Sequence, residues 1–396
     1  MLTEKKSSAS LPVAIAVVVL LLIATGTVFV FSAAANLGHK IDLQKFYEDL
    51  RLRQIIFLPL AVILLLTFSR LKYQILSIQK CLLKSPSIYL LVLSIALVML
   101  VSSQGFYSFL PNIIPPINQH FRWLKIPIGP VTISFQPSEL AKWALIIFLA
   151  AFCCKYSNRL GLYFKGFLPL CLIIALVVGL IILEDFGTAA FVAMLSFCLL
   201  IIAGVKFWHV LTLVPPGACA FILALAASPH RMNRIKAFLH PDQWSDTVGY
   251  QASQSLIALS SGGIWGKGLG RGICKHGHLP EDTTDFIFAI IGEELGFIGC
   301  AAVILLFIIF IWLGILVIIR CKDRFGQLLA GGIVLAIGMQ AAINLGVVTV
   351  VLPTKGIPLP FVSSGGTSLL LSSMAVGILL NIATQTAQQK IEEPVE

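Results

Sequence analysis

The chain has 396 residues, of which 58% are hydrophobic and only 12% are charged. Soluble domains carry roughly 25% charged residues, so this composition excludes an ordinary soluble protein. The formal net charge is +10. The basic residues lie in loops between apolar runs, where anionic lipid headgroups and membrane topology account for them. No basic groove with interleaved aromatic residues is present, so we expect no nucleic-acid partner.

Apolar runs of about 20 residues, the length of a transmembrane helix, recur along almost the whole chain. They predict an all-α polytopic membrane protein, a single domain over residues 1–396 with about ten transmembrane helices. The expected spans are residues 12–34, 55–69, 88–105, 138–154, 166–183, 187–204, 207–228, 285–319, 326–351 and 366–384. The first run is too long for a signal-peptide core of about 7–15 residues, so we expect a retained helix.

An even number of spans places both termini on one side of the membrane. Short loops on one side carry clusters of Lys and Arg, and short loops weigh most in the positive-inside rule. We therefore expect short cytoplasmic tails at residues 1–11 and 385–396. One long extracytoplasmic loop, residues 229–284, is expected between spans 7 and 8. Within it, residues 249–261 have the mixed pattern of an amphipathic helix along the membrane interface.

Two opposite charges, Glu139 and Lys142, stand at the start of the fourth span. Because they are three residues apart, they share one face of a helix and can form an ion pair. One interpretation is a neutralised pair at the membrane interface. The other is a pair that lines a polar cavity and orients another charged group.

Three further cations lie in the outward loops. Arg231 and Arg234 share a face if their segment is helical, and two guanidinium groups suit a phosphate or pyrophosphate. Contact with lipid headgroups is the alternative. Lys355 lies in a proline-rich loop before the last span, and Gln340 and Asn344 form an inward polar stripe in the ninth span. We expect a binding cavity that is open to the outer leaflet.

A glycine-rich stretch, residues 262–272, surrounds Lys267 and Arg271. It lacks the βαβ context of a dinucleotide fingerprint and the GK[ST] sequence of a P-loop, which excludes both kinds of nucleotide site. We expect these glycines to give a mobile backbone that approaches a ligand closely.

Asp285 directly precedes a long apolar run. It is either a carboxylate that caps a helix N-terminus or a catalytic group at the membrane surface. On one continuous helix, Glu293 would share its face but lie about 12 Å along the axis. That distance is too long for a mechanism with two carboxylates, so Asp285 would act as a single base.

Six motifs follow one another between residues 118 and 384. They are QPSELAK at 136–142, DFGTA at 185–189, GYQ with QSLIA at 249–258, GGIWGKGLG at 262–270, LPEDTTDFIFAIIGEELGFIG at 279–299 and LPTKGIPLPFVSSGG at 352–366. Together they resemble the SEDS family of bacterial cell-wall proteins, which includes FtsW and RodA. The PTKG form, with QAAINLG before it, is more similar to FtsW than to RodA.

The resemblance implies a peptidoglycan glycosyltransferase that polymerises lipid II, a disaccharide-pentapeptide on undecaprenyl pyrophosphate. It implies a role in cell division at the outer face of the bacterial cytoplasmic (inner) membrane. The aspartate of the family's TDFIF motif is catalytic and matches Asp285. The glutamate and lysine of QPSELAK match Glu139 and Lys142, and the lysine of PTKG matches Lys355.

The partners that the resemblance implies are lipid II and the growing glycan strand, a class B penicillin-binding protein transpeptidase, other division proteins and membrane lipids. The sequence requires no cofactor, although a divalent cation on the pyrophosphate is compatible with it. This chain departs from the common family pattern at three places. Thr283 stands where His is common, Glu184 where Pro is common, and Ser364 where Tyr is common.

The residues and the resemblance together predict a mechanism. Asp285 takes the proton from the 4-hydroxyl of the acceptor sugar, which attacks the anomeric carbon of the donor and inverts it. The cations expected to stabilise the departing pyrophosphate are Arg231, Arg234, Lys267, Lys355 and Arg122. Two alternatives stay open: a flippase for the lipid-linked precursor and a non-catalytic division scaffold.

Overall fold

The structure is a computed structural model. It describes residues 2–34, 50–78, 85–102, 114, 121–128, 131–226, 228–240, 249–275 and 283–392. Within these ranges, eight helices are long and apolar enough to cross a membrane. Two shorter apolar helices, Gln54–Arg70 and Pro86–Ser102, match the second and third predicted spans. The prediction of a polytopic helical membrane protein with about ten spans is therefore confirmed.

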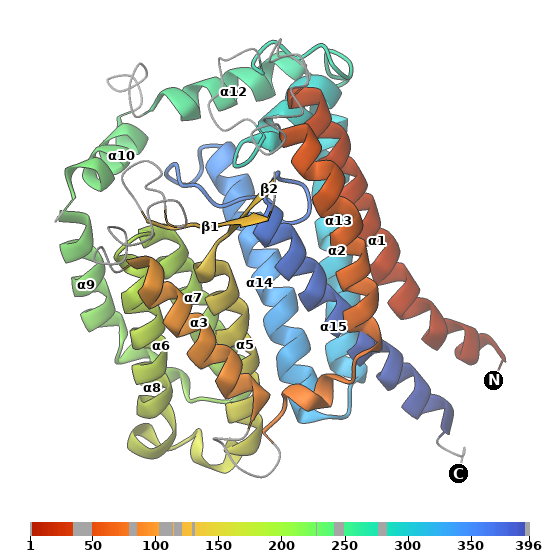
Figure 1. The fold of residues 1–396 in the computed structure, drawn as a ribbon, viewed down its shortest axis with the longest axis vertical. Helices are drawn as coiled ribbons and strands as arrows, with labels where there is room; N and C mark the ends of the chain where they lie inside the picture. The colour runs from red at the N-terminus through yellow and green to blue at the C-terminus, as the bar shows by residue number, and fades with distance from the viewer. Residues whose placement is uncertain are drawn as a thin grey trace.

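The helices run up and down in one bundle, with further helices across one end (Figure 1). In chain order the main helices are α1 (Leu2–Ala34), α2 (Leu50–Arg70), α3 (Pro86–Ser102), α5 (Pro137–Lys155), α6 (Leu168–Ile182), α7 (Phe186–Ala203), α9 (Val214–Ala226), α10 (Pro229–Leu239), α12 (Tyr250–Gly262), α13 (Ile287–Arg320), α14 (Arg324–Val348) and α15 (Gly366–Glu392). The short helical pieces are η2 (Tyr73–Leu76), η4 (Ser157–Arg159), η5 (Tyr163–Phe167) and α8 (Phe207–Leu211).

The chain ends lie together at one end of the bundle, and α10 and α12 lie at the other (Figure 1). This arrangement agrees with an even number of spans. The predicted loop 229–284 contains α10, which carries Arg231 and Arg234, and α12, which matches the expected helix at 249–261. Residues 241–248 and 276–282 of that loop lie outside the described residues.

A short β-hairpin is an addition to the predicted all-α fold. Strand β1 (Leu124–Ile128) pairs antiparallel with β2 (Val131–Phe135), so that Leu124 faces Phe135. The hairpin leads directly into α5. Thr367 Oγ1 donates a hydrogen bond to Ser134 O at 3.0 Å, which attaches β2 to the start of α15.

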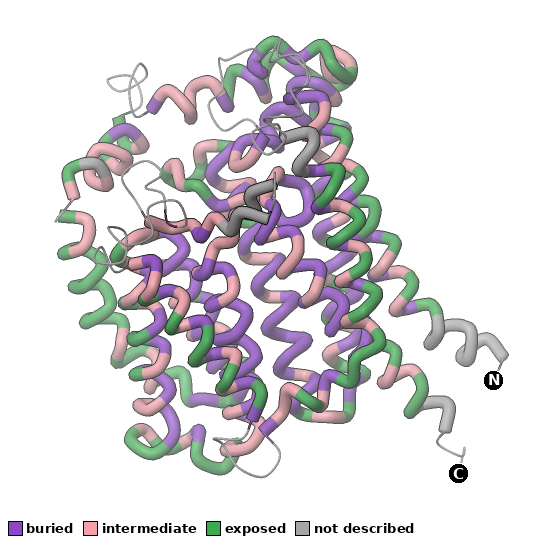
Figure 2. Tube along the Cα trace, viewed as in Figure 1, coloured by how far each residue is buried: buried purple, intermediate pink, exposed green. Residues whose placement is uncertain are grey.

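The centre of the bundle is formed by α5, α14 and α15, which are largely buried, whereas α9 at the edge is exposed (Figure 2). Small residues allow the central helices to approach closely. A Cβ added to Gly332 of α14 would lie 2.5 Å from Ile146 Cγ2 of α5. The N-terminal end of α5 and the C-terminal end of α14 carry the polar residues that surround the candidate site.

Helix α13 is broken at Gly296, whose φ of 67° and ψ of −160° are not helical. The glycine-rich loop fills the break. The amides of Lys267 and Gly268 donate to the carbonyls of Glu293 (3.0 Å) and Glu294 (2.9 Å). The amides of Phe297 and Ile298 donate back to the carbonyls of Gly263 (2.9 Å) and Ile264 (3.3 Å). The loop therefore supplies the partners that an unbroken helix would provide itself.

This insertion corrects one expectation. The eighth predicted span, residues 285–319, is not one continuous helix. Two glycines of the loop, Gly262 and Gly266, allow close approach to the backbone of α13, and the approach of the loop to a ligand stays a prediction. A Cβ added to Gly262 would lie 1.9 Å from Gly292 O, and one added to Gly266 would lie 2.2 Å from Glu294 O.

We predict that Gly296→Ala destabilises the protein. The backbone conformation of Gly296 is restricted to glycine and costs another residue about 1–3 kcal/mol. In addition, an added Cβ would lie 2.4 Å from Gly266 N. The thermal unfolding midpoint of the purified variant in detergent should fall clearly below that of the wild type. Gly179→Ala in α6 is the matched control, because an added Cβ there meets nothing within 4 Å. Equal midpoints for Gly296→Ala and the control would contradict this account.

Candidate active site

Asp285 lies in the turn that precedes α13. The helix begins at Ile287 with Phe286 at the N-cap position, so Asp285 does not occupy the capping position considered above. Its half-buried side chain lies against Gly356, where an added Cβ would be 2.7 Å from Asp285 Oδ2. The carboxylate thus faces the loop between α14 and α15, which also carries Lys355.

Three successive backbone carbonyls, those of residues 283–285, are held from outside the turn. The backbone amide of Ser364 donates to the first at 2.9 Å. Ser363 Oγ donates to the second at 2.5 Å, and Asn344 Nδ2 donates to the third at 2.8 Å. None of these three bonds involves the carboxylate of Asp285, so they fix the turn through its backbone.

The polar stripe of α14 connects this turn to the proline-rich loop. Asn344, which is 1% exposed, donates from the same Nδ2 atom to Ile357 O at 2.8 Å. One turn earlier in the helix, Gln340 Nε2 donates to Pro358 O at 2.9 Å. The prediction that both amides face inward is confirmed, and Asn344 holds the Asp285 and Lys355 segments together.

The Glu139–Lys142 pair lies behind the same network. Lys142 Nζ is 2.8 Å from Glu139 Oε2 and donates to Gln340 Oε1 at 3.0 Å. Lys142 is 1% exposed, which favours the interpretation as a pair that orients another polar group over that of a neutralised pair at the membrane interface. The pair instead orients Gln340, and through it the loop that carries Lys355.

Two of the predicted cations meet at the outer end of α7. Arg231 Cζ lies 4.9 Å from the ring centroid of Phe186, and Lys355 Nζ lies 5.8 Å from the same centroid. Lys355 passes directly over Gly187, where an added Cβ would lie 1.5 Å from Lys355 Cε. Glycine at this position is therefore required for Lys355 to reach the cluster.

Asp185, which sequence reasoning did not place in the site, joins this cluster. Its Oδ1 accepts from the amides of Gly187 and Thr188 at 3.0 Å, which caps α7. Its Oδ2 accepts from Thr188 Oγ1 at 3.0 Å and from an Arg122 guanidinium nitrogen at 3.4 Å. The signal that could have identified it is an aspartate two residues before Gly-Thr, at the start of an apolar run.

The charges of the cluster influence one another. Burial lowers the pKa of Arg234, and the charge of Arg122 lowers it further, while Asp185 and Asp285 act in the opposite direction. Burial also lowers the pKa of Lys355 to about 8; Asp185 opposes this effect and Arg234 adds to it. The site therefore combines partly desolvated cations with few carboxylates, which favours an anionic ligand.

Lys267 lies apart from this cluster in the glycine-rich loop. Its Nζ is 2.7 Å from Glu293 Oε1, and Glu293 is fully buried. The predicted contact between Lys267 and a pyrophosphate therefore stays a prediction. The same ion pair supports the expectation that Glu293 is not a second catalytic carboxylate.

A small cleft of about 20 Å³ adjoins Arg122 and Asp185. Its apolar walls come from Val98 and Val101 of α3 and from Leu180 of α6. Among the residues that the structure describes, no three His, Cys, Asp or Glu side chains are grouped to hold a metal ion. The divalent cation stays a prediction.

We predict that Asn344→Leu destabilises the protein, although the two side chains have similar volumes. The substitution removes the donor from the buried carbonyls of Asp285 and Ile357, at a cost of about 1–3 kcal/mol for each carbonyl that stays unpaired. Thermal unfolding in detergent measures the loss. Met339→Leu, five residues earlier in α14, is the control. An Asn344→Leu variant as stable as this control would refute the assigned bonds.

Comparison with known proteins agrees with this geometry. A family model described as "Cell cycle protein" (FTSW_RODA_SPOVE) matches residues 13–388. The probable peptidoglycan glycosyltransferase FtsW of Coxiella burnetii (strain RSA 493 / Nine Mile phase I) is 38% identical over 339 residues, which cover 85% of this chain and 86% of the relative. The probable peptidoglycan glycosyltransferase FtsW of Geobacter sp. (strain M18) is 40% identical over 281 residues, which cover 70% of this chain and 75% of the relative.

A solved structure shows the same fold. It is described as "Structural coordination of polymerization and crosslinking by a peptidoglycan synthase complex", and one of its chains matches with a TM-score of 0.70 and 24% identity. The match covers 94% of this chain and 97% of the solved chain. This chain therefore belongs to the FtsW/RodA/SpoVE family, the SEDS family that its motifs resemble, and is FtsW-like within it.

Proposed function

We propose that this protein is a peptidoglycan glycosyltransferase that polymerises lipid II into glycan strands for cell division. The observation that carries the proposal is the position of Asp285, a single carboxylate on a fixed turn that faces the loop of Lys355. The curated FtsW relatives, which are named probable peptidoglycan glycosyltransferases, support the same activity.

The cation cluster suits the leaving group. When the glycosidic bond to the donor breaks, negative charge develops on a pyrophosphate, and fixed positive groups stabilise that charge. Arg231 and Lys355 both lie beside the ring of Phe186, and Arg234 is close enough to influence the charge of Lys355, so these three cations provide such groups. Arg122 extends the positive surface to the mouth of the cleft. Lys267 is a further candidate from the sequence alone.

Asp285 suits the proton transfer. The 4-hydroxyl of the acceptor sugar attacks the anomeric carbon while Asp285 takes its proton. The bond to pyrophosphate breaks in the same displacement, so an α-linked donor gives a β-1,4 linkage. The backbone bonds of the turn fix where the carboxylate stands when it receives the proton.

Membrane attachment of both substrates supplies part of the rate acceleration. Two lipid-anchored molecules held side by side react as if they were one, which removes much of the entropic cost of their encounter. Apolar residues of α3 and α6 lie beside Arg122, so we expect the polyprenyl chain to lie along these helices with its phosphate at Arg122. Surrounding membrane lipids complete the environment of these chains.

The proposed location is the bacterial cytoplasmic (inner) membrane at the division site, with both termini in the cytoplasm. The α10 and α12 end of the bundle then faces outward, together with the candidate site (Figure 1). A class B penicillin-binding protein transpeptidase is the proposed partner, beside other division proteins. The presence of the solved neighbour in a peptidoglycan synthase complex supports such a partner.

We predict that Asp285→Asn abolishes polymerisation of lipid II by purified protein, with a fall of at least about 100-fold, because a general base contributes about 10²–10⁴-fold. The variant should stay folded, since Asn344 binds the backbone of residue 285 and not its side chain. Asp323→Asn, at the N-cap of α14, is the matched control and should stay active.

A flipping assay on the same preparation separates the alternatives. Full polymerase activity of Asp285→Asn would refute its role as the base. Flipping without polymerisation by the wild type would favour a transporter, and absence of both activities would favour a scaffold.

We predict that use of the donor depends on pH through Lys355. Its pKa of about 8 means that the ammonium is charged below pH 8 and is lost as the pH rises through that value. The kcat/KM for lipid II should therefore fall above pH 8. The arginine of Lys355→Arg stays charged above pH 8, so this variant should not show the fall in kcat/KM. Lys355→Ala should have a low kcat/KM at all pH values and little loss of stability. If kcat/KM of Lys355→Arg also falls above pH 8, another group is responsible for the pH dependence.

A further inference from the structure

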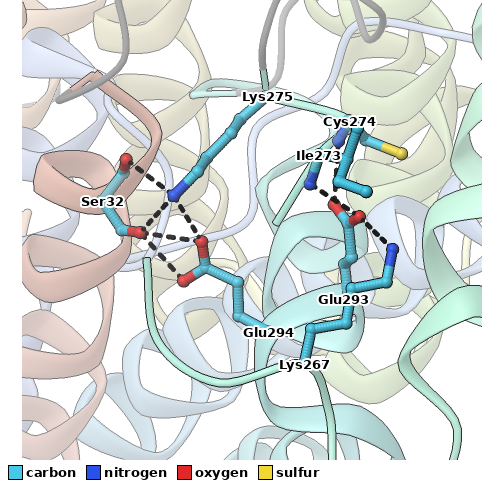
Figure 3. A network of polar contacts seen from close by, with 7 residues as sticks. All are labelled: Ser32, Lys267, Ile273, Cys274, Lys275, Glu293 and Glu294. Atoms are coloured by element: carbon cyan, nitrogen blue, oxygen red, sulfur yellow. Dashed lines mark hydrogen bonds and ion pairs between the residues drawn. The ribbon is translucent and has the colours of Figure 1, made fainter. Parts of the chain in front are cut away.

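Two adjacent buried glutamates take no part in the proposed chemistry. Glu293 and Glu294 are both fully buried (Figure 3). Glu293 pairs with Lys267 of the glycine-rich loop, and Glu294 pairs with Lys275, which follows that loop. Lys267 Nζ lies 2.7 Å from Glu293 Oε1, and Lys275 Nζ lies 2.8 Å from Glu294 Oε1. Both glutamates directly precede the break of α13 at Gly296.

The Lys275–Glu294 pair extends to the first transmembrane helix. Ser32, near the outer end of α1, donates from Oγ to both carboxylate oxygens of Glu294, at 2.9 and 2.8 Å. Lys275 Nζ also donates to Ser32 Oγ at 3.2 Å and to Ser32 O at 3.4 Å. Lys275 is 3% exposed, so solvent hardly competes for these bonds. Three elements, α1, the loop and α13, thus meet at one ion pair.

Glu293 fixes the same loop at two further points. Its carboxylate accepts from the amide of Ile273 at 2.8 Å and from that of Cys274 at 3.1 Å. Together with the backbone bonds across the break, the two glutamates specify where the loop lies along α13. A shift of the loop by one residue would separate both lysines from their carboxylates.

The helical segment 287–295 connects this network to the candidate base. It is about 13 Å long, and the side chains of residues 287–291 are at most 2% exposed. Asp285 stands at one end of the segment, held by Asn344 and its neighbours, and Glu294 stands at the other. A rigid, fully enclosed segment transmits a displacement of one end to the other.

We infer that Lys275, Glu294 and Ser32 are positioning residues for Asp285, which fix the segment 287–295 from the end opposite to the site. This inference rests on the proposed function. Stability alone does not account for the pair, because buried ion pairs can often be replaced by apolar residues of similar volume without loss of stability. Their established use is to specify one arrangement of chain segments among several, and here that arrangement sets the position of the base.

The first test compares the double variant Lys275→Met/Glu294→Leu with the wild type. Removing both charges leaves no unpaired buried ion, so the variant should keep a thermal midpoint within a few degrees of the wild type. The kcat for lipid II polymerisation, expressed per folded protein, should fall about tenfold. The KM should stay within twofold, because the cation cluster is untouched. Amide hydrogen exchange of residues 263–275 should become faster in the variant.

The second test avoids the risk that the double variant fails to fold. Ser32→Ala removes only the hydroxyl that joins α1 to the ion pair, and kcat should fall about threefold. Ser32→Thr retains a hydroxyl and should restore kcat. Ser196→Ala is the matched control, a buried serine of α7 whose hydroxyl bonds to Val192 O within its own helix, and it should keep the wild-type kcat.

The outcomes separate this inference from the proposed function. A wild-type protein without polymerase activity contradicts the proposed function and, with it, the positioning role. If the wild type is active, and Ser32→Ala and the double variant have the same kcat as the wild type, the positioning role alone is contradicted. Losses of activity that only follow the amount of folded protein would assign the network to stability, and would also overturn the inference.

Discussion

Backbone groups that leave a helix inside a membrane protein need new partners, because hydrocarbon offers no water for hydrogen bonding. This constraint acts at both ends of the segment 287–295. At Gly296, the glycine-rich loop supplies the amides and carbonyls that the broken helix lacks. At the turn of residues 283–285, α14 and the Ser363–Ser364 segment supply the donors. The position of Asp285 follows from these backbone requirements before any substrate is present.

Buried charges in the described part of the chain are arranged in two ways. In three lysine–glutamate pairs the positive and the negative charge neutralise each other: Lys142–Glu139, Lys267–Glu293 and Lys275–Glu294. The cluster at the outer end of α7 has cations in excess of carboxylates, and burial lowers the pKa of Lys355 to about 8. Burying a surplus of positive charge is unfavourable in the free protein. An anionic ligand would offset that cost, so the imbalance favours this cluster as the place for the pyrophosphate of the proposed substrate.

The spans could be predicted from sequence because the bilayer sets the length of every apolar run. Asp285, Arg231 and Lys355 could be predicted because charges beside membrane helices are costly and therefore informative. The break at Gly296 could not, because it depends on bonds to a loop about thirty residues away along the chain. The partner of Lys267 was missed for the same reason: Glu293 lies on another element. Sequence patterns give local periodicity, whereas these contacts are long-range.

The departures from the common family pattern are explained by the same backbone contacts. Thr283 and Ser364 stand at two such positions, and they bond to each other through the Ser364 amide and the Thr283 carbonyl. Neither side chain is needed for that bond. The turn that carries Asp285 can therefore be attached in the same way with Thr and Ser at these positions, as here, or with the His and Tyr that are common in the family. Glu184, at the third position, accepts from the amide of Phe121 at 2.9 Å and holds the segment that carries Arg122. Proline has no side-chain acceptor and could not make this contact. The departure at Glu184 therefore alters how the wall of the cleft is held, and the other two leave the backbone support of Asp285 unchanged.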